Sequence, residues 1–173
     1  RLAAVERNPI KRWAYAREAR LLSRYERDTY RRFGQVVFVS DVDRQLFGIR
    51  GAHVIPICVD PSTSPPVKRN PASHTILHLG TMFWPPNIEG VLWFTREVLP
   101  LIRAQIPDVH FVIVGKNPPP AVTDLQASIP GVEVTGYVAD PTPYLEECAV
   151  FIVPLHAAGG MRVKIVDAWC WGL

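Results

Sequence analysis

The chain has 173 residues, of which 48% are hydrophobic, enough for one large domain or two small ones around a buried core. No apolar run is long enough for a transmembrane helix, and the three cysteines and five histidines lack the spacing of metal ligands. We therefore expect a cytoplasmic protein with reduced cysteines and no metal. Because the sequence opens with Arg1 rather than Met, we also expect it to be a piece of a longer protein.

The net charge of +3 is unevenly distributed, since residues 1–50 hold twelve Lys or Arg against six Asp or Glu. The surplus lies mostly in residues 10–33, and such a segment could meet nucleic acid or an anionic membrane. Acidic residues are interspersed there, as on a solvated helix. We expect no nucleic-acid partner, and peripheral contact with a membrane stays open.

The first third of the chain shows a long helix followed by shorter elements. Spaced apolar residues predict a helix over residues 10–33, which Gly34 ends. Two short strands and one short helix follow, at residues 35–40, 53–57 and 41–47. The Pro-rich segment 61–73 then predicts a linker, so the expected division is residues 1–60, the linker 61–73, and residues 74–173.

After the linker, strands and helices alternate regularly. Apolar runs predict strands at residues 75–80, 109–115, 132–136 and 150–154. Between and after them, periodic segments predict helices at residues 87–105, 121–128, 141–148 and 161–171. This alternation indicates an α/β fold, a Rossmann-like parallel sheet with helices on both faces.

Ligands of such sheets bind beyond the carboxyl ends of the strands. Three of the four loops that leave these ends open with a glycine at or next to the strand: Gly80, Gly115 and Gly136. A cation, Lys116, follows the second of them. It could meet an anionic ligand there or be an ordinary solvated lysine.

The last loop and helix carry the strongest single pattern. Gly159 and Gly160 precede a helix with Arg162 and Lys164 near its start. Glycines, free N–H groups and cations together suit a diphosphate, although an ordinary turn with solvated cations fits the pattern equally well. We expect Arg162, in the first helical turn, to be the stronger contact and Lys164 the weaker. Asp167 could bind ribose hydroxyls or pair with a cation.

Other chemistry is not apparent in the sequence. There is no GxGxxG after the first strand, no Walker A loop and no GxSxG elbow. The adjacent Glu146 and Glu147 would face different ways on a helix, so they are poor partners for acid–base catalysis.

Four segments, taken together, resemble the donor-binding domain of GT-B glycosyltransferases, specifically family 4 (group 1). They are LHLGTMFWPPNIEGVLWFTREVLPLI, VHFVIVGKNPP, VEVTGYVADPTPYLEECAVFIVPL and GGMRVKIVDAWCWGL, which span residues 77–173. The segment VFVSDVDRQLF to HVIPICVD also resembles the crossing between the two domains of that family. The resemblance implies a half of a GT-B fold, truncated at both ends.

The resemblance further implies transfer of a sugar from a nucleotide-diphosphate sugar to a carbohydrate or lipid-linked acceptor, with retention and without a cofactor or metal. It assigns donor binding to Gly80 and Thr81 at the phosphate, Tyr137 and Val138 at the base, and Asp167 at the ribose. Lys116, Gly159, Gly160, Met161, Arg162 and Lys164 complete the expected set. Gly159 stands where the family has the first of two glutamates, and Asp167 where it has the second. The catalytic residues are not identified, and we expect the isolated piece to be inactive.

Two other functions stay open on the sequence. A GT-B nucleotide-sugar epimerase would share the fold but should carry carboxylates near the sugar. A non-catalytic flavodoxin-like binding or regulatory module would share the alternation of strands and helices, although the first strand end lacks the acidic cluster of a receiver domain.

Overall fold

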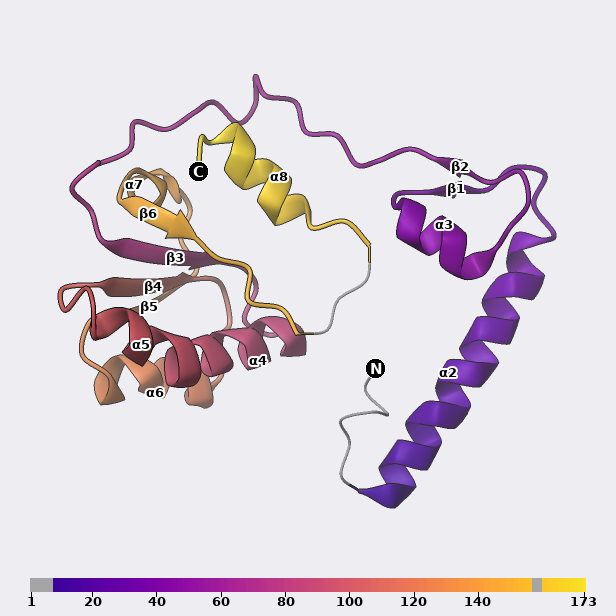
Figure 1. The fold of residues 1–173 in the computed structure, drawn as a ribbon, viewed down its shortest axis with the longest axis horizontal. Coiled ribbons are helices and arrows are strands. Elements are labelled where there is room, and N and C mark those ends of the chain that lie inside the picture. Colours follow the sequence, from indigo (N-terminus) through magenta and orange to yellow (C-terminus); the bar gives the residue numbers. More distant parts are fainter. Residues whose placement is uncertain (1–7, 157–159) are drawn as a thin grey trace. The chain divides into compact units, whose positions relative to one another are not determined.

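The computed structural model of the protein describes residues 8–156 and 160–173 (Figure 1). Within these ranges the chain forms two compact units. The first comprises residues 8–57 with residues 160–161, and the second comprises residues 58–156 with residues 162–173. The second unit holds the parallel sheet and is therefore the one that positions the candidate site.

The first unit is built from helix α2 (Pro9–Tyr30), strand β1 (Val37–Phe38), helix α3 (Asp41–Phe47) and strand β2 (His53–Val54). The Asn8 side chain caps α2 by accepting hydrogen bonds from the Ile10 and Lys11 N–H groups. The two strands pair in parallel. Helix α2 has no buried residue, so the apolar stripe expected from the sequence lies exposed among the described residues.

The core of the second unit is a four-stranded sheet of β3 (Thr75–Leu79), β4 (His110–Val114), β5 (Val132–Gly136) and β6 (Cys148–Phe151). All neighbouring strands are parallel, and the order across the sheet is β5-β4-β3-β6. Strand β6 begins and ends earlier than the expected range 150–154. The parallel α/β fold predicted from the sequence is confirmed.

Helices cover both faces of this sheet, as Figure 1 shows. Helices α4 (Pro85–Trp93), α5 (Leu99–Arg103) and α6 (Pro120–Ser128) lie on one face. Helices α7 (Thr142–Glu146) and α8 (Val163–Cys170) lie on the other. Strand β4 serves both cores, because Phe111 and Ile113 face the first layer while Val112 and Val114 face the second. This two-sided burial explains its uninterrupted apolar sequence.

The single helix expected at residues 87–105 is interrupted. A π-helical segment, η1 (Phe94–Val98), separates α4 from α5, and the Leu99 N–H bonds to the Phe94 carbonyl. Pro100 explains the difference, because it has no N–H to donate and its ring crowds the preceding turn. A locally wider turn accommodates both effects.

The Pro-rich segment 61–73 is bonded to the second unit. The Val67 N–H donates to the Trp171 carbonyl, and the Asn70 N–H donates to the Glu146 carbonyl. The Arg69 guanidinium also donates to the Ala149 carbonyl, over 2.7 Å. These bonds hold the segment beside β6, α7 and α8, with Ile57 and Cys58 forming the boundary between the units.

Candidate functional site

The order of the strands reverses at β3 and β6. The chain passes from β3 outward through β4 to β5 and then returns to the other side of β3 as β6. The helices that follow β3 and β6, α4 and α8, lie on opposite faces of the sheet (Figure 1). Ligands of open α/β sheets bind at such a reversal point, at the edge formed by the carboxyl ends of the strands.

Backbone hydrogen bonds fix the loops at this edge. The Gly80 N–H donates to the Val114 carbonyl, and the Gly115 N–H donates to the Gly136 carbonyl. The backbones approach so closely that a Cβ atom on Gly115 would overlap the Gly80 carbonyl oxygen. Glycine at position 115 is thus required by close approach rather than by an unusual dihedral angle.

A cavity of about 280 Å³ opens beside these loops. Among the residues that line it are five expected from the sequence to bind a ligand: Gly80, Thr81, Lys116, Tyr137 and Val138. The Lys116 side chain is exposed, with its Nζ 5.9 Å from the centre of the Phe83 ring. Three loops that are distant in sequence therefore contribute to one site.

Lys164, from the first turn of α8, reaches the carboxyl end of β3. Its Nζ donates to Asn87 Oδ1 over 3.3 Å and lies so close to Gly80 that a Cβ there would overlap it. The buried Asn87 is itself fixed, because its Nδ2 donates to the Thr81 carbonyl over 2.8 Å. Burial lowers the pKa of Lys164. Among the described residues, no carboxylate forms an ion pair with this ammonium group.

His78, the penultimate residue of β3, is fully buried beside Lys164. Its Nδ1 lies 3.1 Å from the Ile152 carbonyl. Burial, with a smaller contribution from the charge of Lys164, lowers the pKa of His78 to about 4. The imidazole is therefore neutral at physiological pH. Its Nε2 has no hydrogen-bond partner among the described residues.

The start of α8 differs from the expectation. Arg162 is the N-cap residue and precedes the helix instead of lying in its first turn. Its dihedral angles, φ −95° and ψ 85°, are not helical. Asp167 lies further along α8 and is partly buried.

The other residues expected in the last loop are Gly159, Gly160 and Met161. Gly160 and Met161 group with the first unit, and Gly160 adopts a positive φ of 70°. Gly159 lies outside the described residues.

Two residues of this edge were missed by the sequence reasoning, His78 and Asn87. The available signal was a histidine within an otherwise apolar strand, one residue before the strand's last position. Asn87 follows two prolines at the start of a helix, and nothing in the sequence marks it as buried. Only the position of Lys164 on α8, close to both residues, indicates that His78 and Asn87 belong to the site.

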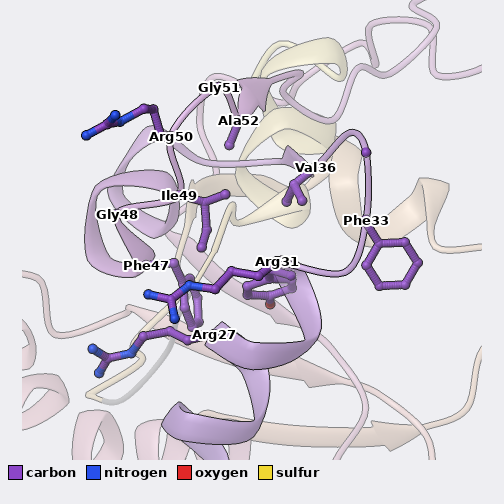
Figure 2. Close-up of a pocket in the computed structure, with 12 residues that line it drawn as sticks. Arg27, Arg31, Phe33, Val36, Phe47, Gly48, Ile49, Arg50, Gly51 and Ala52 are labelled. Carbon is purple, nitrogen blue, oxygen red and sulfur yellow. The ribbon is translucent and has the colours of Figure 1, made fainter.

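A second cavity, of about 380 Å³, lies within the first unit (Figure 2). It is lined by Arg27, Arg31 and Arg50 together with residues just before β1 and β2, such as Val36 and Ala52. The Arg27 guanidinium already donates to the Ser23 hydroxyl over 2.8 Å. Because this cavity lies at the amino ends of its strands, it does not correspond to the ligand-binding edge of a parallel sheet.

The described residues contain neither a candidate membrane-spanning helix nor a candidate metal site. No helix there is both long enough and apolar enough to cross a bilayer. No group of three or more His, Cys, Asp or Glu side chains within those ranges is arranged to hold a metal ion.

Comparisons with solved structures show the same fold. TarM superposes with a TM-score of 0.67 at 13% identity, over 86% of this chain and 30% of TarM. A mutant of S. aureus TarM in complex with fondaparinux, alpha-GlcNAc-glycerol and UDP gives a TM-score of 0.64 at 16% identity, with the same coverage. The pneumococcal O-GlcNAc transferase GtfA in complex with UDP and GlcNAc gives 0.56 at 12% identity, over 86% of this chain and 31% of GtfA.

Sequence comparisons point to one family. An uncharacterised 44.6 kDa protein of the cps region of Klebsiella pneumoniae is 25% identical over 100 residues, which are 54% of this chain and 26% of that protein. The chain thus spans about a quarter to a third of the length of these relatives. Residues 73–173 match the profile of the family described as glycosyl transferases group 1. Because the match covers more than half of the chain, the chain belongs to the group 1 glycosyl transferase family.

Proposed function

We propose that this chain forms the donor-binding part of a glycosyltransferase that uses a nucleotide-diphosphate sugar. The observation that carries the proposal is the Lys164 ammonium, which is held at the carboxyl end of β3 without a carboxylate partner among the described residues. A partly buried cation without a counter-ion is stabilised by an anionic ligand. The diphosphate supplies that anion.

The cavity beside Lys164 suits the rest of the nucleotide. Gly80 lies against Lys164 and, together with Thr81, lines the cavity, so the diphosphate would lie along these two residues. The base would then enter the cavity against Tyr137 and Val138, with Lys116 at its rim. Asp167, one turn after Lys164 on α8, would bind the ribose hydroxyls.

The sequence predicted that Arg162 would be the stronger diphosphate contact and Lys164 the weaker one. We propose the reverse order. Lys164 reaches Gly80 and Asn87, whereas Arg162 stands before the helix. We therefore assign the principal phosphate contact to Lys164 and an additional charge to Arg162, with the N–H groups at the start of α8 adding to both. In this role the cations stabilise the negative charge that develops on the departing diphosphate, and no metal is needed for that task.

We further propose that the reaction retains the anomeric configuration and that the acceptor is a carbohydrate. The support for the acceptor comes from the similar structures, whose descriptions name alpha-GlcNAc-glycerol and GlcNAc together with UDP. The catalytic residues are not assigned.

Isothermal titration calorimetry and NMR chemical-shift mapping of the intact protein test the proposal. UDP, GDP, ADP and TDP would each be compared with the corresponding nucleoside. We expect at least one diphosphate to bind tenfold or more tightly than its nucleoside, with chemical-shift changes at Gly80, Thr81 and Lys164. If no diphosphate binds at millimolar concentration, or if the changes cluster at the amino ends of the strands, the donor-binding function is wrong.

A further inference from the structure

The tautomer of His78 follows from its surroundings. A carbonyl oxygen only accepts hydrogen bonds, so the 3.1 Å contact with Ile152 requires the proton on Nδ1. The neutral ring then has a bare lone pair on Nε2. This atom is fully buried and has no partner among the described residues. A buried acceptor without a donor is costly, so it points to a donor that engages it in the working protein.

Two donors lie near Nε2, on Lys164 and on Asn87. A Cβ on Gly80 would overlap Lys164 Nζ and would lie 3.0 Å from Asn87 Nδ2 and 3.2 Å from His78 Nε2, so the three nitrogens flank the same point on Gly80. Asn87 Nδ2 already donates to the Thr81 carbonyl, whereas Lys164 has a flexible chain. Lys164 has three N–H donors, and Asn87 Oδ1 receives one of them. A rotation of the flexible lysine chain would bring a second donor to Nε2, with the first still on Asn87.

We infer that His78 is a positioning residue, whose Nε2 accepts a hydrogen bond from Lys164 and, together with Asn87 Oδ1, fixes the ammonium group at the carboxyl end of β3. This inference rests on the proposed donor-binding function. It extends that function, because it explains how the lysine is held in the absence of a carboxylate among the described residues.

Neutral acceptors are the appropriate partners for a phosphate-binding lysine. A carboxylate would hold the ammonium equally well but would cancel most of the charge that attracts the diphosphate. A histidine and an asparagine satisfy two N–H groups without adding negative charge, and the third N–H remains for the ligand. The neutrality of His78 at physiological pH is essential here, because an imidazolium could only repel the lysine.

Two amide variants of His78 distinguish the role of Nδ1 from that of Nε2. In His78→Asn the side-chain NH₂ can replace Nδ1–H toward Ile152, but nothing replaces Nε2. In His78→Gln the longer chain can present its oxygen at the position of Nε2. The readout without ligand is the pKa of Lys164, measured by NMR of its Cε and Nζ atoms in the intact protein. We expect His78→Asn to lower this pKa and His78→Gln to restore most of it, because an acceptor stabilises the charged lysine.

The titratable side chains on the elements around Lys164 must be followed in the same experiment. They are His78 on β3, Glu89 on α4, His156 after β6, and Asp167 and Cys170 on α8. The matched control is His74→Asn. His74 is an exposed histidine before β3 that pairs with Asp108, and its replacement should leave the pKa of Lys164 unchanged.

The second readout is the affinity for the nucleoside diphosphate that binds the parent. His78→Asn should weaken it about five- to tenfold, with nucleoside binding unchanged, and should have no further effect in a Lys164→Met background. The inference is overturned if His78→Asn leaves the pKa of Lys164 at the parent value, or if it weakens binding equally with and without Lys164. If the parent binds no diphosphate, the proposed function fails, while the pKa of Lys164 still decides whether His78 positions it.

Discussion

Replacing Lys164 with methionine should lower ligand affinity and raise protein stability at the same time. Methionine keeps much of the length and the apolar stem but removes the charge. The ammonium is partly buried against Gly80 and Asn87, and burial lowers its pKa from the ordinary value of 10.5. A residue kept for its charge and not for packing should produce these opposite effects.

The loss of affinity follows from one charge-assisted hydrogen bond. Such bonds contribute about 1.5–3 kcal/mol, which corresponds to a roughly ten- to hundredfold weaker diphosphate at about 1.4 kcal/mol per tenfold. The gain in stability follows from proton linkage. Between the folded pKa of Lys164 and 10.5, the unfolded chain binds more protons, so stability rises as pH rises through this window. At neutral pH Lys164 is charged in the folded protein, which therefore bears the full free-energy cost of burying this ammonium group. Lys164→Met removes that cost.

Calorimetric titration and urea unfolding of the intact protein measure the two effects separately. The control is Lys68→Met, because Lys68 is an exposed lysine in the same unit and its loss changes the net charge equally. It should change neither affinity nor unfolding free energy appreciably. The reasoning is refuted if Lys164→Met binds the diphosphate like the parent, or if it lowers the free energy of unfolding by more than about 1 kcal/mol, a typical cost of losing ordinary packing.

Three further predictions concern the same edge of the sheet. Gly80→Ala should weaken diphosphate binding, because the added Cβ displaces the Lys164 ammonium group. Gly115→Ala should lower Tm more than Gly80→Ala does, because its Cβ meets the Gly80 backbone and not a side chain. Affinity measurements and thermal melts of both variants decide this. When the pH falls from 7 to 4, the free energy of unfolding should decrease by about 3 kcal/mol more in the parent than in His78→Asn. The reason is that the His78 imidazole has a pKa of 6.5 in the unfolded chain and of about 4 in the folded chain. Urea unfolding at both pH values would show equal losses if His78 is not the cause. Diphosphate binding should be the same in EDTA as in magnesium, and a clear loss in EDTA would contradict recognition by protein cations alone.

The sequence alone determined the elements of the second unit and their order. The runs 75–80 and 109–115 form strands whose middle residues are buried on both faces, and such burial requires a nearly continuous apolar pattern. Residues 132–136 form the edge strand β5, in which Glu133 is exposed. The family resemblance was local, since it rested on the order and spacing of short segments, and the match of residues 73–173 bears it out.

Only the tertiary structure decided how the site residues meet. The non-helical conformation of Arg162 depends on how the chain packs around it, which periodicity does not report. The neighbourhood of His78, Asn87 and Lys164 exists because β6 returns beside β3 and α8 then passes over the strand ends. These residues lie up to 86 positions apart in the sequence. The role inferred for His78 depends on Lys164, and only the fold brings the two side chains into the same neighbourhood.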